Sequence, residues 1–315
     1  MKKNLVFIII VLLLLSGCQS KGIYEKNYFA FDTVIDLKIY EGGSEKILKE
    51  LEEEIYRLEE VFSIHDESSQ ISKLPNIEDA EGDLASIISL SLEMEELTGG
   101  SFDPFLGRVS ALWAFGSPEE NIPEASLISA ALEESKNRNI EDLDFGGIAK
   151  GYAADRLLQM AKDRGVKSAL FNLGGNIITL GTYEGRSFNI GIQDPLDKAG
   201  AILGVVKMKE NSAVTSGDYQ RGFDKDGVRY HHILDPENGY PVQKDLMSVS
   251  VILPNSARAD AYSTALFVMG FEEARTYALD NGVPVVLVNR DGEVLVLNDN
   301  DFEFELRNED YRLVD

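Results

Sequence analysis

The chain has 315 residues and a formal net charge of −24 at neutral pH. A balance this acidic argues against nucleic-acid binding, which needs a basic footprint, and against spreading on an anionic lipid surface. The length is enough for one large domain or two small ones, and no linker rich in Pro, Gly or Ser divides the chain.

The N-terminal segment has the pattern of a secretory signal peptide. Lys2 and Lys3 precede an apolar run, 5–15, that is too short to span a bilayer comfortably, and small residues follow it. The stretch "LLSGC" resembles the lipobox of bacterial lipoproteins, in which the cysteine is lipidated and becomes the new N-terminus. Cys18 is the only cysteine, so no intramolecular disulfide can form. An ordinary signal peptide with an incidental cysteine is the alternative.

These features predict the domain plan and the location. We expect a lipid-anchored protein on the extracytoplasmic face of the cell membrane, held through Cys18. The plan is a signal peptide at 1–17, a tether at 18–28 and one domain at 29–315.

Beyond the tether, the residues at 31–40 alternate between two faces, which is typical of a strand. Apolar stripes at helical spacing follow, and paired glycines at 99–100 end the second of them. The residues at 101–116 are expected to form a loop rich in aromatic side chains. The predicted helices are 44–62, 83–98, 124–136, 148–164, 257–269 and 272–280.

The residues at 168–253 have a different pattern, in which short β-branched or aromatic runs alternate with glycine turns. A hairpin is expected at 284–297, turned at Asp291 and Gly292. Helices and strands are segregated along the chain rather than strictly alternating. The sequence therefore predicts an α+β fold, with a largely antiparallel mixed sheet and packed helices.

The first stretch that could carry chemistry is "DFGGIAKGYAADR" (144–156). Gly146 and Gly147 precede a helix whose first turn carries Lys150. Glycines let a ligand approach the backbone, and a helix N-terminus favours anions, so Lys150 could reach a phosphate. The spacing matches neither a P-loop nor a dinucleotide-binding fingerprint. A plain glycine turn before an amphipathic helix is the alternative.

A histidine pair lies in "RYHHILDPENGYPV" (229–242). Neighbouring side chains of a strand point to opposite faces, so His231 and His232 are not expected to line one site together. One of them could act as a general base or hydrogen-bond partner, with the other structural. A half-buried strand histidine without a function is the alternative.

The stretch "ARADAYSTALFVMG" (257–270) reads as a helix entering a core, yet it carries Asp260 in its first turn and Thr264 one turn later. Oxygen ligands at i and i+4 lie on one face and suit a hard cation such as Mg²⁺, whereas nothing in the chain has the pattern of a zinc site. An aspartate favoured by the helix dipole beside an incidental threonine is the alternative.

Six motifs in order carry a family resemblance. They are "GSFDPFLGRVSALWAFG", "DFGGIAKGYAAD", "NLGGN", "TSGDYQR", "HHILDPENGYPV" and "ARADAYSTALFVMG". Together they resemble the ApbE family of FAD:protein FMN transferases, many of which are bacterial lipoproteins. The similarity runs from about Tyr28 to past Gly282.

The resemblance implies a reaction and its participants. The family takes FAD and Mg²⁺, releases AMP, and attaches FMN through a phosphodiester to a Ser/Thr hydroxyl in a flavinylation motif of an acceptor protein. Some members instead hydrolyse FAD to FMN and AMP. A Mg²⁺-dependent FAD pyrophosphatase is therefore one alternative, and a lipoprotein that only binds flavin is another.

The resemblance also implies roles for residues. The metal ligands would be the carbonyl of Gly147 and the side chains of Asp260 and Thr264, and His232 would take part in catalysis. Phe31 stands where the family often has Met, and His65 stands where it often has Tyr. The implied flavin or FAD contacts are Phe31, His65, Ser101, Phe102, Asp103, Asp144, Lys150 and Leu234.

Overall fold

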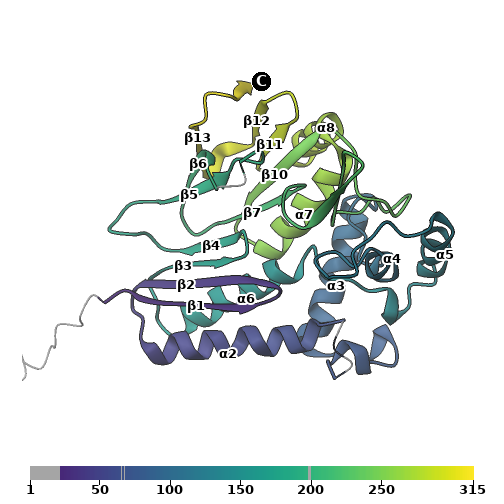
Figure 1. Ribbon diagram of the computed structural model, residues 1–315. Helices are drawn as coiled ribbons and strands as arrows, with labels where there is room; N and C mark the ends of the chain where they lie inside the picture. The colour runs from purple at the N-terminus through teal and green to yellow at the C-terminus, as the bar shows by residue number, and fades with distance from the viewer. Residues whose placement is uncertain (1–21, 65, 67, 198–199) are drawn as a thin grey trace, which may run out of the picture.

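The computed structural model describes residues 22–64, 66, 68–197 and 200–315. Cys18 and His65, both among the predicted functional residues, lie outside these ranges. A nine-stranded sheet forms the centre of the molecule, with helices on one face and a smaller sheet against the other (Figure 1). This arrangement confirms the predicted α+β class.

The main sheet has the order β1-β2-β3-β4-β7-β10-β11-β12-β14, and every neighbouring pair is antiparallel except β12 with β14. A second sheet has the order β13-β6-β5, and β8 pairs with β9 as a separate hairpin. The strands are β1 Tyr24–Ala30, β2 Thr33–Glu41, β3 Ser168–Leu173, β4 Asn176–Leu180, β5 Phe188–Gln193, β6 Ile202–Met208, β7 Ser212–Gly217, β8 Gly222–Lys225, β9 Val228–His231, β10 Leu246–Leu253, β11 Val285–Asn289, β12 Glu293–Leu297, β13 Glu303–Leu306 and β14 Arg312–Val314.

The predicted helices are confirmed to within two residues at each end. Ser44 caps the first of them, because its Oγ accepts the N–H of Ile47 at 3.3 Å. The helices are α2 Glu45–Phe62, α3 Gly82–Leu97, α4 Gly107–Trp113, α5 Ala125–Ser135, α6 Ala149–Asp163, α7 Ser256–Met269 and α8 Phe271–Asn281. The hairpin of β11 and β12 is also confirmed, with its turn at Asp291 and Gly292.

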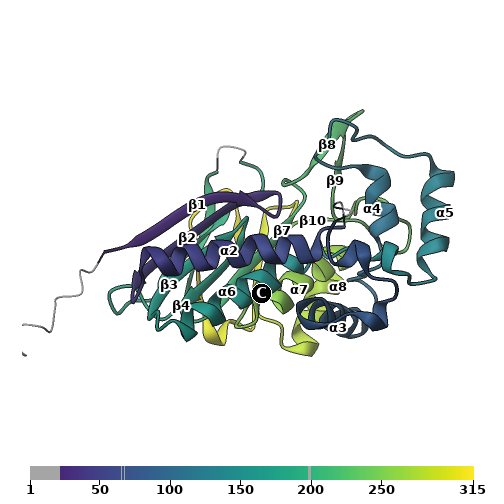
Figure 2. The same cartoon turned by 90° about the horizontal axis from the view of Figure 1, so that it is seen from below.

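The hydrophobic core has three parts. The largest lies between the main sheet and α2, α6, α7 and α8, and Figure 2 shows α2 running along β1 and β2. The second lies between the two sheets. The third is a small cluster around Trp113, where α4 and α5 meet the β8–β9 hairpin. This third cluster supports the part of the chain that carries the histidine pair.

Three boundaries differ from the prediction. Strand β1 begins at Tyr24, within the segment expected to be a tether. Phe31 lies in the β1–β2 turn rather than in a strand, because Phe31 and Asp32 both adopt left-handed backbone conformations (φ 50° and 54°). The expected loop at 101–116 contains α4, whose seven residues are too few to show a helical repeat.

Among the residues that the structure describes, no helix has both the length and the apolar character needed to cross a membrane.

Candidate active site

The site is built on a close crossing of α6 and α7 at Gly151. A Cβ atom at Gly151 would lie 2.3 Å from the carbonyl oxygen of Ser256 and 2.7 Å from Cα of Ala257. Contacts between carbon atoms are normally 3.5–4.0 Å, so only glycine permits this approach. The glycine therefore lets the two helix backbones touch.

Asp155, one turn further along α6, caps the start of α7. Its two carboxylate oxygens accept the backbone N–H groups of Ser256 and Ala257, each at 2.9 Å. The Asn255 side chain accepts the N–H of Arg258 at 2.8 Å. Because of these caps α7 begins at Ser256. Asp260 therefore lies at the start of the second turn, whereas the sequence had predicted it in the first.

The side chain of Asp260 points back to α6. Its Oδ2 accepts the N–H of Gly151 at 2.9 Å, and the residue is only 4% exposed. No cationic side chain in the described residues forms an ion pair with it. Burial of Asp155, together with the neighbouring Asp260 carboxylate, raises the pKa of Asp155 to about 6. The α6–α7 crossing thus places two carboxylates in a poorly solvated region.

The three predicted metal-binding residues converge. Thr264 lies one turn after Asp260 on α7, and a Cβ atom built on Gly147 would be 3.1 Å from its Oγ1. The same Cβ would be 3.2 Å from Cε2 of Phe102. Gly147, Thr264 and Phe102 therefore lie in direct proximity, although they come from three separate segments.

A hydrogen-bonded pair of turns brings Phe102 and Gly147 together. The N–H of Asp144 donates to the carbonyl of Pro104 at 2.8 Å, and the Asp144 side chain accepts the N–H of Gly146 at 2.7 Å. Asp103 accepts the N–H of Phe105 at 2.8 Å, and burial raises the pKa of its carboxyl group. Ser101, half-buried, begins this loop.

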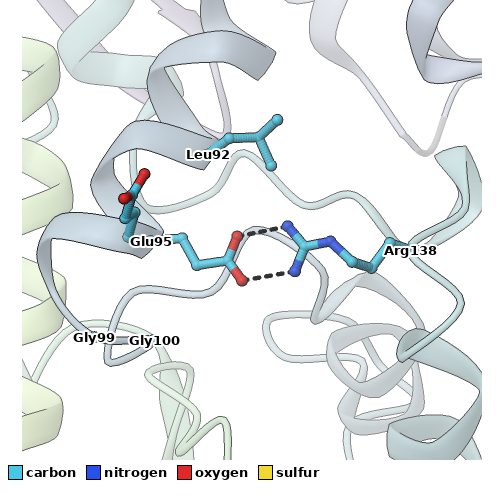
Figure 3. Close-up of a pocket in the computed structure, with 6 residues that line it drawn as sticks. Leu92, Glu95, Gly99, Gly100 and Arg138 are labelled. Carbon is cyan, nitrogen blue, oxygen red and sulfur yellow. Dashed lines mark hydrogen bonds and ion pairs between the residues drawn. The ribbon is translucent and has the colours of Figure 1, made fainter.

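Arg138 connects the 101–105 loop to α3. Its guanidinium lies 4.0 Å from the centre of the Phe105 ring and forms two hydrogen bonds with Glu95 of α3, at 2.7 and 2.6 Å. Figure 3 shows this pair spanning a surface hollow at the end of α3. The hollow is lined by Leu92, Glu95, Glu96, Gly99, Gly100 and Arg138, and it includes none of the predicted site residues.

The two histidines have different surroundings, as the strand geometry predicted. His231 is 1% exposed and packs edge-on against Phe267 of α7. Its Nδ1 accepts the N–H of Ile233 at 3.3 Å, and Nε2 lies 2.8 Å from the carbonyl of Val242, to which it donates. Both ring nitrogens are used within the fold, so His231 is the structural member of the pair.

His232 follows the end of β9 and is half-buried. Its Nδ1 lies 3.4 Å from the carbonyl of Arg221. Burial, then the positive charges of Lys150 and Arg221, lower the pKa of His232 to about 3. His232 is therefore neutral near pH 7 and lies near Lys150, whose Nζ donates to the carbonyl of Gly146 at 3.3 Å.

Two predicted contacts, Phe31 and Leu234, make their observed contacts outside this group. Phe31 is half-buried at the β1–β2 turn, and its N–H donates to Oε1 of Glu59 at 2.6 Å. Leu234 bridges to Pro241 and packs with Trp113 in the third core cluster.

Sequence reasoning missed Gly151, Asp155 and Arg221. Gly151 and Asp155 stand inside the quoted motif "DFGGIAKGYAADR", where their i and i+4 spacing places them on one face of the helix. Arg221 ends the quoted motif "TSGDYQR", but nothing in that motif indicates its contact with a turn 189 residues away.

The donors at the centre fit a hard cation. A carboxylate, a hydroxyl and a backbone carbonyl are the oxygen ligands that Mg²⁺ prefers, with few protein ligands and the rest from phosphate or water. Asp260 is buried without a neutralising side chain among the described residues, and a buried carboxylate normally has a partner. No group of three His, Cys, Asp or Glu side chains in the described residues could hold a metal. The described residues therefore offer no cluster of thiolate or imidazole ligands, which a softer metal would need.

The fold and the site define a protein suited to a hard cation and an anionic ligand beside a neutral histidine. The model of the ApbE family matches residues 31–300. This match covers most of the chain, and the chain therefore belongs to the ApbE family.

Individual relatives agree with this assignment. A Treponema pallidum protein named FAD:protein FMN transferase is 37% identical over 220 residues, which is 61% of each chain. A Klebsiella pneumoniae protein of the same name is 28% identical over 93% of this chain and 98% of its own. The crystal structure of the ApbE protein from Thermotoga maritima is 33% identical, with a TM-score of 0.77 over 87% of this chain and 96% of its own.

Proposed function

We propose that this chain transfers FMN from FAD to a Ser/Thr hydroxyl of an acceptor protein, forming a phosphodiester and releasing AMP. The observation that carries the proposal is the convergence of Gly147, Asp260 and Thr264 at the α6–α7 crossing, with Lys150 and His232 nearby. The names of the relatives support the same activity.

Each part of the site has a role in this proposal. Mg²⁺ would be held by the carbonyl of Gly147 and the side chains of Asp260 and Thr264, and it would neutralise charge on the pyrophosphate. Lys150 adds a second positive charge for the phosphates. Phe31, Ser101, Phe102, Asp103, Asp144 and Leu234 are the proposed flavin or FAD contacts, and His65, outside the described residues, is a further one.

The transfer itself requires one proton acceptor. The acceptor hydroxyl oxygen bonds to the flavin-side phosphorus, and the bond from that phosphorus to the bridging oxygen breaks. AMP leaves with the bridging oxygen and its electron pair. We assign the hydroxyl proton to His232, because the family resemblance implies a catalytic role for this histidine and because its ring lies near Lys150.

We also propose that residues 1–17 are removed and that Cys18 carries a lipid anchor on the extracytoplasmic face. The support for this is the sequence "LLSGC", since the segment lies outside the described residues. The acceptor protein would then be reached on that same side of the membrane.

Intact mass measurement tests the activity. The purified protein is incubated with FAD, Mg²⁺ and a candidate acceptor, and a gain matching FMN on the acceptor is expected. His232→Ala is expected to lower the transfer rate by about 10²–10⁴-fold while FAD still binds, because general-base catalysis contributes that much. His231→Gln serves as the control, since it should lower the melting temperature and leave the rate per folded molecule similar. Unchanged transfer by His232→Ala would refute the role of His232.

The same experiment separates the alternatives. Rapid release of FMN and AMP without an acceptor would establish a pyrophosphatase instead. Tight FAD binding with no turnover under Mg²⁺ would establish a flavin-binding lipoprotein. Such a binding protein normally has two α/β lobes with alternating strands and helices, whereas this chain forms one nine-stranded, largely antiparallel sheet.

A further inference from the structure

The position of His232 depends on Arg221, which precedes β8. The backbone N–H of His232 donates to the carbonyl oxygen of Arg221 at 3.2 Å, and the ring Nδ1 lies 3.4 Å from the same oxygen. A carbonyl oxygen can only accept a hydrogen bond, so Nδ1 must carry the hydrogen. The contact therefore selects one neutral form of the ring, with Nδ1 protonated and the Nε2 lone pair free.

The backbone of Arg221 is held on one side by the β8–β9 hairpin. Gly222 comes next and pairs with His231, and its φ of 146° is a conformation that L residues rarely adopt. A Cβ atom there would lie 2.2 Å from the carbonyl oxygen of Tyr230. This close approach fixes where the Arg221 carbonyl can lie relative to β9.

The side chain of Arg221 contacts the β1–β2 turn. One guanidinium nitrogen donates to the carbonyl of Asp32 at 3.0 Å, and another lies 3.7 Å from the Asp32 carboxylate. Both groups belong to the β1–β2 turn, which also carries Phe31. An exposed ion pair contributes little to stability, so the contact matters chiefly for position. It links the turn with a proposed flavin contact to the residue that orients the proposed base.

We propose that Arg221 is a positioning residue for the transfer reaction: its guanidinium is tied to the Phe31–Asp32 turn, and its carbonyl holds His232 in the Nδ1–H form with Nε2 facing the substrate hydroxyl. The catalytic part of this inference rests on the proposed function. The structural part, which is the tautomer of His232 and its dependence on the Arg221 side chain, does not.

The tautomer is measured first, by ¹⁵N NMR of the imidazole rings in the free protein at neutral pH, without FAD or acceptor. The chain has three histidines, and a His232→Ala sample assigns the signals. We expect a protonated Nδ1 and an unprotonated Nε2 for His232. A wild-type spectrum with the proton on Nε2 overturns the proposal without any Arg221 variant.

Arg221→Gln is then compared with the wild type. We expect kcat for FMN transfer to fall by about 10- to 100-fold with a KM for FAD within about threefold, because a small misplacement of a catalytic group has effects of that size. We also expect the His232 spectrum to change to a mixture of tautomers. Arg221→Lys keeps a cationic donor and should recover part of both. Arg186→Gln is the charge-matched control, since Arg186 pairs with Glu184 and is 75% exposed, and it should match the wild type.

Three results for Arg221→Gln would contradict the proposal. Wild-type kcat and tautomer in Arg221→Gln would show that the side chain positions nothing. A lower kcat with an unchanged tautomer would place its effect elsewhere, and a raised KM for FAD alone would make it a substrate-binding residue. If Arg221→Gln does not fold, the wild-type spectrum and Arg221→Lys still decide. Absence of transfer by the wild type would refute the proposed function and leave the NMR result standing.

Discussion

Replacing Gly151 with alanine tests how closely α6 and α7 must approach to build the site. The added Cβ would lie 2.3 Å from the Ser256 carbonyl oxygen and 2.7 Å from the Cα of Ala257. To restore ordinary contact distances between the added Cβ and the α7 backbone, the two helices must separate by about 1 Å. Both obstructing atoms belong to the backbone, so no side-chain rotation can make room.

The sign of the effect distinguishes this position from an ordinary helix glycine. Alanine in a helix interior is normally more stable than glycine by about 0.5–1 kcal/mol. Overpacking typically costs about 1–3 kcal/mol, and a rigid backbone contact belongs at the upper end of that range. Subtracting the gain in helix propensity from this cost, we expect Gly151→Ala to lower the free energy of unfolding by about 2 kcal/mol.

The same displacement should reduce activity. The Gly151 N–H that bonds Asp260 at 2.9 Å lies at the point of separation, so Asp260 would move relative to Gly147. Misplacement by about 1 Å can reduce a rate about 100-fold. Urea denaturation measures the stability, and the initial rate of FMN transfer measures the activity. Gln159→Ala on the exposed face of α6 is the control and should change neither. A Gly151→Ala protein as stable and active as the wild type would refute the reasoning.

Two further predictions concern charge. Asp260→Asn keeps an oxygen acceptor for the Gly151 N–H but removes the negative charge, so a folded protein without Mg²⁺-dependent transfer is expected; an active variant that still responds to Mg²⁺ would contradict the ligand role. For pH, burial lowers the folded pKa of His231, and that of His232 is about 3, against about 6.5 when unfolded. At these two histidines the unfolded chain binds protons first, whereas Asp155, with its pKa raised to about 6, binds its proton first in the folded state. Because the two histidines outweigh the one carboxyl group, the free energy of unfolding should fall as pH drops below about 6.5. Chemical denaturation at pH 7.5 and 5.0 checks this, and His232→Gln should weaken the dependence.

Local patterns in the sequence were enough to predict most elements of the fold. Helices with a clear apolar stripe, such as α2, were located because one buried face repeats with the helical period. Helix α7 begins at Ser256, one residue earlier than predicted, because Asp155 on another helix supplies part of its cap. The order of the main sheet, in which β4 neighbours β7 and β7 neighbours β10, depends on pairings across long insertions that no local pattern specifies.

The candidate site was predictable in parts. The spacing of Asp260 and Thr264 indicated one face of a helix, and the glycines at 146–147 indicated a close approach. Neither pattern alone shows that a Cβ on Gly147 would meet Thr264 and Phe102. Convergence of this kind is set by tertiary packing, so it required either a family resemblance or a structure.

Net charge illustrates the same limit. The net charge of −24 disfavours an anionic ligand, and it disfavours an extended polyanion most of all. Yet Lys150 and Arg221, from separate segments, both lie close enough to His232 to lower its pKa. An anionic ligand of the size of FAD is bound by the charges within a few ångströms, because more distant surface charges are screened by salt. An acidic surface and a local pair of cationic side chains can therefore occur in the same protein. The cationic pair, rather than the net charge, favours an anionic ligand in the site.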